Sequence, residues 1–332
     1  MSMLTAPQMT APQMTAGQIQ AGQAIINALA VYARSPQAFS TSPIHLAAAY
    51  VSECVMRAIA THPELGDRMV LRGGRYIASL VGAKAQRVTS DVDVLVEDAD
   101  ELTPGELFSH IREALSGQIG PGLIVDPDSL AIQSDKALAV DGGLGFVIRG
   151  YAWLGTQRQP LRVDIGLGDR LPVHAVQTHE PMLPGYGRSF KMRAVTPELV
   201  LADKLRLLDR DPQKANLKHL YDASLLLLPH CHHDRLQAAV EASWTNRGMQ
   251  PPASVAALSI ANMAWAIRRH DEWIGNWQTG TGRKHSDQDP TLEQAVTTLL
   301  AWLAHTPLSA AADMQPEKAT VRVGRRTMRV PV

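Results

Sequence analysis

Cysteine, aromatic residues, net charge and long apolar runs are all scarce in this sequence. Cys54 and Cys231 are the only cysteines among 332 residues, which excludes a disulfide framework and is typical of the reducing cytoplasm. The 32 basic and 32 acidic residues balance, so a surface for nucleic acid has to be a local patch. Aromatic residues make up 5% of the chain, which argues against a broad platform for stacked bases. No apolar run is long enough to span a bilayer, so we expect no membrane partner and a cytoplasmic location.

The N-terminus consists of a degenerate five-residue repeat. TAPQM, TAPQM, TAGQI and QAGQA follow one another from Thr5, and the first charged residue is Arg34. Short polar repeats of this kind bury too little apolar surface to fold. We therefore expect residues 1–23 to form a low-complexity, disordered arm.

Beyond this arm, the spacing of apolar residues predicts a mixed α/β half followed by a helical half. Helical periodicity predicts helices over 44–60, 75–83, 103–116, 196–210, 215–228, 254–270 and 291–305. Short β-type runs bounded by glycine predict strands over 68–72, 88–96, 122–126, 145–154 and 160–167. We expect an α/β (α+β) domain over 24–195, a helical domain over 196–310 and a basic tail over 311–332.

Two aspartates interrupt the apolar strand pattern VTSDVDVLV. Aspartate is unfavourable in strands, and alternation along a strand places Asp91 and Asp93 on the same face. Carboxylates held so close repel each other unless a divalent cation compensates them, and Mg²⁺ or Mn²⁺ prefers such oxygen ligands. A D-x-D pair alone is often a solvated strand end, so the metal interpretation needs further support.

A second predicted strand, LRVDIGL, carries a third carboxylate. Asp164 shares one face with Arg162, while the leucine, valine and isoleucine before and after it share the other face. If this strand lies beside the first, Asp164 completes a cluster of three carboxylates. Such a cluster on adjacent strands is typical of two-metal nucleotidyl transfer, in which one ion activates the attacking oxygen and the other stabilises pyrophosphate.

A glycine pair, Gly73-Gly74, stands where a predicted strand passes into a predicted helix. Because glycine has no Cβ, backbone N–H groups there can approach a triphosphate at the helix N-terminus. An isolated Gly-Gly is usually a turn, but its place upstream of the aspartates favours phosphate binding.

Four motifs occur in one order: LRGGRYIASL, RVTSDVDVLV, TPELVLADKL and KHLYDASL. Together they resemble the AbiE-type (AbiEii/AbiGii) nucleotidyltransferase toxins, relatives of the mycobacterial MenT toxins. The resemblance covers residues 45–228. It implies a polymerase-β-like nucleotidyltransferase core with a mixed sheet, NTP as substrate, and Mg²⁺ or Mn²⁺ as cofactor. The implied partners are a cognate antitoxin protein and tRNA.

The resemblance also implies roles for individual residues. Asp91, Asp93 and Asp164 would hold the metal ions, and Asp222 would be the functional acid of the last motif. The nucleotide-binding residues would be Gly73, Gly74, Arg75, Thr89 and Lys204.

Some of these positions depart from the family pattern. Arg75 stands where the family has threonine, so its guanidinium could bind phosphate in place of the hydroxyl. Thr89 replaces a serine and keeps the hydroxyl, and Arg87 matches the family arginine. His219 replaces an aspartate, which leaves Asp222 to act.

Lys204 can also be argued from periodicity. It lies three residues after Leu201 and four before Leu208, at the edge of the apolar stripe of its helix. A lysine that faces inward needs an anionic partner, whereas a snorkelling lysine keeps its ammonium in water. Beside a carboxylate cluster we favour a contact to the triphosphate, with Asp222 positioning Lys204 or acting as base.

Three further segments carry charge or metal-ligand side chains. HCHHD, residues 230–234, packs its ligands consecutively, which favours a polar loop over a zinc site. Two basic stretches, 188–218 and 318–329, are normally solvated faces, but beside a nucleotidyltransferase centre either could contact RNA phosphates.

The sequence therefore predicts a metal-dependent nucleotidyltransferase of the toxin type. The resemblance points to the 3′ end of tRNA as acceptor, in a toxin–antitoxin or phage-defence pair. One alternative is a transferase that adenylylates a protein or a small molecule. Another is a degenerate member that binds nucleotide or a partner without turnover, which the departures at Arg75 and His219 keep open.

Overall fold

The structure, a computed structural model, describes residues 14–82, 89–97, 102–133, 144–171, 174–183, 185–210, 217–258, 290–305, 322–323 and 326–327. The α-helices are α1 (Ala16–Tyr32), α2 (Pro43–Thr61), α3 (Gly73–Val81), α4 (Pro104–Ala114), α6 (Pro197–Arg210), α7 (Leu217–Tyr221), α8 (His233–Thr245) and α11 (Leu292–Ala304). A π-helix (Asp222–Leu227) follows α7, and short 3₁₀ turns span Pro127–Ser129, Leu228–His230 and Val255–Ala257.

Nine strands form one mixed sheet. They are β1 (Met69–Arg72), β2 (Val92–Val96), β3 (Gly117–Gly120), β4 (Leu123–Val125), β5 (Ala131–Gln133), β6 (Leu144–Leu154), β7 (Gln157–Leu167), β8 (His174–His179) and β9 (Phe190–Val195). The strand order is β3-β4-β6-β7-β2-β1-β9-β8, and β5 also pairs with β6. Only the β2–β7 and β1–β9 pairs are parallel among these strands. A further pair, β10 (Arg322–Val323) with β11 (Arg326–Thr327), lies outside this sheet.

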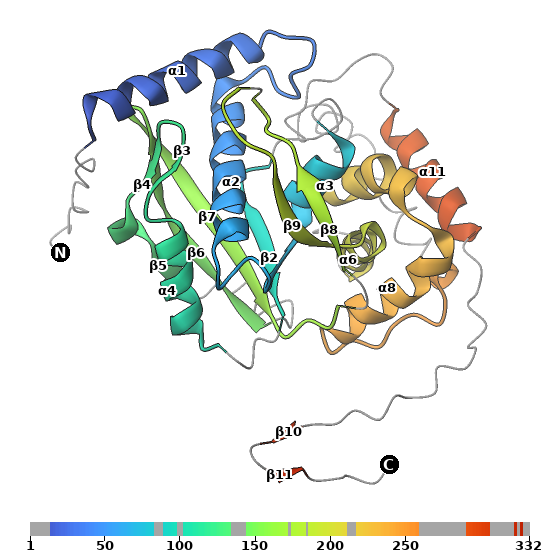
Figure 1. The fold of residues 1–332 in the computed structure, drawn as a ribbon. Coiled ribbons are helices and arrows are strands. Elements are labelled where there is room, and N and C mark those ends of the chain that lie inside the picture. The colour runs from blue at the N-terminus through green and yellow to red at the C-terminus, as the bar shows by residue number, and fades with distance from the viewer. Residues whose placement is uncertain are drawn as a thin grey trace, which may run out of the picture.

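Helix α2 covers the middle of the sheet (Figure 1). Pro43 opens the helix, a position where its missing N–H costs no hydrogen bond, and His62 ends it with an extended backbone. Its buried side chains include Tyr50, Val55 and Met56, and the helix packs against β7 and β9. Burying each large apolar side chain contributes about 1.5–3 kcal/mol, so this face fixes α2 on the sheet.

The helical C-terminal half contacts α3 through the π-helix and lies on the β9–β8 side of the sheet (Figure 1). Helix α6 contacts α8 and the π-helix, and α11 contacts the π-helix in turn. Buried Leu201 of α6 and Leu299 of α11 belong to the same hydrophobic cluster as Leu71 of β1. The predicted mixed α/β fold followed by helices is therefore confirmed, while the predicted domain boundary near residue 195 stays a prediction.

The N-terminal arm is shorter than predicted. Helix α1 begins at Ala16, and Thr15 caps it by accepting a hydrogen bond from the N–H of Gln18. A Cβ on Gly22 would lie 1.9 Å from the backbone nitrogen of Gly155, so the helix sits directly on the β6–β7 turn. Composition alone could not show this close glycine contact. The expectation of a disordered arm is wrong for residues 16–23, and residues 1–13 lie outside the described part.

Three other predicted features lie mostly or wholly outside the residues that the structure describes. Most of the predicted helix 254–270 lies outside the described residues, as do the side chains of the basic tail. Arg87 also lies outside them. In the part of the chain that is described, no helix has the length and apolar character needed to cross a bilayer.

Candidate active site

Asp93 and Asp164 lie side by side at the centre of the sheet. Strand β2 runs parallel to β7 in a register that pairs Asp93 with Asp164. Directly paired residues share a face of the sheet, so the two carboxylates are neighbours on rigid elements. The condition set by the sequence, that these two strands be adjacent, is met.

Gly73 lies directly under the carboxylate of Asp93. Its φ is +68°, a conformation that residues with a Cβ rarely adopt, and it opens α3 straight after β1. A Cβ on Gly73 would lie 2.1 Å from Oδ2 of Asp93. Glycine is therefore required here twice, by the backbone conformation and by the close approach of the carboxylate.

The N-terminus of α3 faces the same region. Gly73 and Gly74 are its first two residues, and no side chain caps their N–H groups. Unsatisfied N–H groups and the helix dipole favour an anion at this position. The predicted phosphate site and the predicted carboxylate pair thus lie next to each other in space.

Charges of both signs surround Asp93. Burial raises the pKa of its carboxyl, and Asp164 and Asp91 raise it further, while Arg72 and Lys204 lower it. Bringing like charges together in a desolvated site is unfavourable unless a cation compensates them. A cation bound beside Asp93 would therefore be stabilised by the neighbouring carboxylates.

Asp91 and Asp164 both have partners in this structure. Asp91 comes one residue before β2, so it is not on the strand as predicted, and its Oδ1 accepts a hydrogen bond from the Ser90 hydroxyl at 3.0 Å. Arg162 donates to both oxygens of Asp164, from Nε at 2.7 Å and Nη2 at 2.9 Å. The three carboxylates do not converge within 4.8 Å of one another.

These residues nevertheless fit a hard divalent cation. Asp93 and Asp164 offer adjacent carboxylate oxygens, the ligand type that Mg²⁺ and Mn²⁺ prefer. Gly73 has no side chain that would displace the carboxylate of Asp93. Asp91 precedes Asp93 by two residues in the same segment. Arg162 would have to yield at least one oxygen of Asp164 to the ion.

Lys204 lies in a buried polar cluster beside the site. Its Nζ is 3.2 Å from Oδ2 of Asp222 and 3.4 Å from Nδ1 of His219. The side chain of Asp222 is fully buried and that of Lys204 is 9% exposed, so the snorkelling alternative does not apply. The predicted proximity of Lys204 and Asp222 is confirmed. The positive charge of Lys204 also lowers the pKa of Asp93.

Arg75 lies near Glu53 of α2, and its predicted contact with phosphate stays a prediction. Its side chain is buried, and burial lowers its pKa while the charge of Glu53 on α2 raises it. Arg75 is not among the groups that act on Asp93. Thr89 lies partly exposed in the segment before Asp91.

Arg72 is a site residue that sequence reasoning missed. It pairs with Asp93 across β1 and β2, and its Nη1 is 3.3 Å from Asp169 and 4.0 Å from Asp203. Its position directly before the glycine pair was the available signal. Only the antiparallel register shows that it neighbours Asp93.

The basic stretch 188–218 is solvated in part, because Arg188 and Lys191 are exposed while other members have partners inside the protein. Arg193 pairs with Glu97, and Arg206 is buried and bonds to Ser243 at 3.3 Å. Lys204 is buried with Asp222, as described above. Arg193, Lys204 and Arg206 are therefore engaged within the protein, and the expected RNA contact along this stretch stays a prediction.

The HCHHD segment behaves as the predicted polar connection. Cys231 and His232 link the last 3₁₀ turn to α8, and the N–H of His232 donates to Glu198 at 2.9 Å. His233 stacks on Trp302 of α11 with ring centroids 3.9 Å apart. These contacts hold helices together and need no metal.

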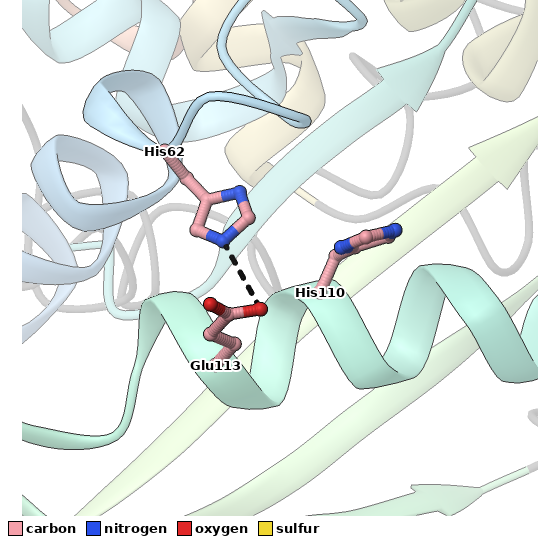
Figure 2. A group of neighbouring side chains, drawn as sticks. All are labelled: His62, His110 and Glu113. Carbon is pink, nitrogen blue, oxygen red and sulfur yellow. Dashed lines mark ion pairs between the residues drawn. The ribbon is translucent and has the colours of Figure 1, made fainter.

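Within the described residues, one group of three side chains brings metal-ligating atoms within 4.8 Å: His62, His110 and Glu113. His62 comes from the end of α2 and the other two from α4 (Figure 2). Nε2 of His62 is 3.7 Å from Glu113, and its Nδ1 accepts a hydrogen bond from the N–H of Glu64 at 3.3 Å. At 3.7 Å the contact between His62 and Glu113 is an ion pair when His62 is protonated, and it is too long for a hydrogen bond.

A family model described as nucleotidyl transferase AbiEii toxin, type IV toxin–antitoxin system, matches residues 54–298. The chain belongs to this AbiEii family. It is therefore a nucleotidyltransferase of the toxin type, and the resemblance stated from its motifs is confirmed. A search of functionally curated proteins gave no match.

Three solved structures resemble this chain at low sequence identity, and the first of them has the same fold. The nucleotidyltransferase toxin MenT4 from Mycobacterium tuberculosis H37Rv is 14% identical with a TM-score of 0.51, covering 84% of this chain and 89% of MenT4. JHP933 from Helicobacter pylori is 16% identical with a TM-score of 0.44, covering 79% of this chain and 91% of its own. A candidate nucleotidyltransferase from H. pylori is also 16% identical, with a TM-score of 0.46 and coverages of 79% and 94%.

Proposed function

We propose that this AbiEii protein transfers a nucleoside monophosphate from an NTP to the 3′-terminal hydroxyl of a tRNA. The observation that carries the proposal is the register of Asp93 beside Asp164, with the uncapped N-terminus of α3 next to them. Carboxylates for a metal and N–H groups for phosphates are what a triphosphate needs to be held and oriented.

In this proposal Asp91, Asp93 and Asp164 hold Mg²⁺ or Mn²⁺. When bound, such ions polarise the α-phosphate and neutralise charge on the leaving pyrophosphate. The backbone N–H groups of Gly73 and Gly74 bind the phosphate chain at the N-terminus of α3.

The cationic side chains orient the triphosphate. Lys204 approaches the same region from α6, and Asp222 holds it there at 3.2 Å. Because Asp222 is fully buried, we assign it to positioning Lys204 and not to proton transfer. Arg72, between Asp93 and Asp169, supplies a second cation.

The reaction is a substitution at phosphorus. The acceptor oxygen bonds to the α-phosphorus while the bond to the bridging oxygen breaks and pyrophosphate leaves, and a carboxylate of the cluster takes the hydroxyl proton. A cognate antitoxin would counteract this activity in the bacterial cytoplasm, as in a toxin–antitoxin or phage-defence pair.

The acceptor is tested by labelling. The protein is incubated with Mg²⁺, each α-labelled NTP in turn, and total tRNA that is either intact or periodate-oxidised at its 3′ end. We expect label on intact tRNA only. Equal labelling of oxidised tRNA would contradict a 3′ acceptor, and pyrophosphate release with no labelled RNA would point to a protein or small-molecule acceptor.

A further inference from the structure

The hairpin of β6 and β7 continues past the carboxylate pair. Strand β7 begins at Gln157, seven residues before Asp164, whereas its neighbour β2 begins only at Val92, which pairs with Val163. At about 3.3 Å per residue, the β7 segment from Arg158 to Asp164 extends about 20 Å beyond the site. The hairpin therefore forms an extended surface, here called the track, that ends at Asp164.

The two faces of this track differ in burial. Residues Ala152, Leu161 and Val163 are buried on the face that α2 covers. The opposite face alternates with them and is partly or fully exposed. We call this face the β6–β7 ribbon; it consists of Arg149, Tyr151 and Trp153 on β6 and Arg158, Pro160 and Arg162 on β7.

The ribbon shares its face with Asp164. The antiparallel register pairs Arg149 with Arg162, Tyr151 with Pro160 and Trp153 with Arg158, and Arg162 lies two residues from Asp164. Residues two apart on a strand point the same way. A chain that follows the ribbon therefore ends at the carboxylate that we place in the metal site.

The ribbon carries three arginines and no acidic residue. Arg149 and Arg158 are exposed, and neither forms an ion pair with a residue that the structure describes. Arg158 lies over the ring of Tyr151, 4.5 Å from its centroid, which holds the guanidinium and the ring in one layer. Exposed arginine without a carboxylate is suited to bind phosphate.

Arginine interleaved with aromatic rings favours single-stranded nucleic acid over other anions. The guanidinium groups can bind phosphodiesters, and the partly exposed rings of Tyr151 and Trp153 can stack on bases without regard to sequence. An acidic protein surface would use the arginines but has no need of the rings. The low overall aromatic content does not exclude this local arrangement.

We propose that the β6–β7 ribbon binds the single-stranded end of the acceptor nucleic acid and leads its terminal hydroxyl to Asp164. The proposal rests on the proposed function for its chemistry, but the binding surface can be tested separately. Arg149 and Arg158 contact phosphates, and Trp153 stacks on a base.

The test measures binding and transfer with the same variants. Binding of a short fluorescent single-stranded RNA is followed by anisotropy over a salt series, for wild type, Arg149→Gln/Arg158→Gln and the control Arg235→Gln. Arg235 is exposed on α8, so the control removes a charge of the same kind outside the ribbon. Melting temperatures confirm folding of each variant.

We expect the double variant to bind RNA at least tenfold more weakly, with unchanged NTP affinity. The slope of log K against log salt should fall by about 1.4, because each phosphate contact to a single strand contributes about 0.7. Trp153→Phe should keep RNA affinity within a few fold, whereas Trp153→Ala should lower it by about five- to hundredfold. The control should match wild type.

Equal RNA affinity and salt slope in wild type and the double variant would overturn the inference, as would wild-type protein that binds no single-stranded RNA. If wild type labels RNA and the double variant keeps its KM, this surface is wrong while the proposed function stands. If RNA binding depends on Arg149 and Arg158 but no label is transferred, the surface stands while the proposed function fails. The inference would also be overturned if the double variant lost transfer of label to a protein but bound RNA as wild type does.

Discussion

At the residue scale, the contact between Gly73 and Asp93 is the most constrained feature of the site. The Gly73 backbone has φ +68°, and the space where a Cβ would stand holds the Asp93 carboxylate, 2.1 Å away. A small side chain there must displace the carboxylate or the start of α3. The glycine thus couples the phosphate site to the metal site.

Gly73→Ala tests this coupling. We expect at least a hundredfold loss of transfer activity and about 1–3 kcal/mol lower stability, from the strained φ and the displaced carboxylate. Gly105→Ala in α4 is the control, since its new Cβ would meet no atom closer than 3.9 Å and alanine favours helix. Activity assays and urea unfolding measure both effects. Wild-type activity in Gly73→Ala would contradict the assigned contact.

We expect ionised Asp93 to lower the stability of the metal-free protein. Burial raises its pKa, so in the metal-free protein its ionised form destabilises the folded state. The stability that the protonated form provides is present below the unfolded pKa of about 3.9 and is lost as the pH rises through the folded-state value.

Asp93→Asn should therefore melt at a higher temperature than wild type at neutral pH in EDTA, and it should be inactive. The difference in melting temperature should shrink as the pH falls toward 4. Scanning calorimetry over that pH range measures it. An equal or lower melting temperature at neutral pH would contradict the electrostatic account.

At the element scale, α6 and the π-helix meet through Lys204 and Asp222. A π-helix shifts the side chains that follow it relative to an α-helix, and such segments are frequent at functional sites. Here the π-helix begins at Asp222 itself, where the fully buried carboxylate faces Lys204. The sequence predicts one continuous helix from 215 to 228, because leucine periodicity does not distinguish α from π turns.

Lys204→Met should be destabilising by about 3–5 kcal/mol, because it leaves the buried carboxylate of Asp222 without this ammonium. The double variant Lys204→Met/Asp222→Leu should recover most of that stability, since both charges are gone, yet remain inactive. Guanidinium unfolding of both proteins measures the difference. A double variant no more stable than Lys204→Met would show that the pair does not account for the loss.

The sequence predicts β1, β2, β4, β6 and β7 from their local pattern, but it does not predict β3, β5, β8 and β9. The strands carrying Asp93 and Asp164 are visible as β-type runs, and their acidic faces follow from alternation. That these strands are neighbours, and that β1 brings Arg72 beside Asp93, depends on long-range register. The burial of Arg75 near Glu53 of α2 could not be predicted either, because a motif position does not give the direction in which a side chain points on its helix.

At the scale of the whole molecule, Asp169 connects the sheet to the helical half. Arg247, after α8, donates to it from Nη2 at 3.0 Å, and Arg72 of β1 lies 3.3 Å away. The side chains of Arg247 and Asp169 are 6% and 7% exposed. Nothing local in the sequence marks this triad, whose members come from three distant segments.

Arg247→Ala should lower the free energy of unfolding by about 3 kcal/mol, the lower end for a broken buried pair because Arg72 still neutralises Asp169. Arg112→Ala is the control. Its partner Asp128 is 87% exposed, so the loss there should stay below about 1 kcal/mol. Urea denaturation compares the two. Similar small losses in both would contradict a role for the triad in docking the helical half.

The central claim is that nucleotidyl transfer takes place at the Asp93–Asp164 pair, and pyrophosphate release tests it most directly. Wild type, Asp93→Ala, Asp164→Ala and the surface control Asp128→Ala are compared with NTP, Mg²⁺ and total RNA. We predict that wild type and the control release pyrophosphate alike, while each site variant falls by at least about a hundredfold, as loss of an essential group in a metal site does. Release at the wild-type rate by Asp93→Ala or Asp164→Ala would contradict this account of the active site.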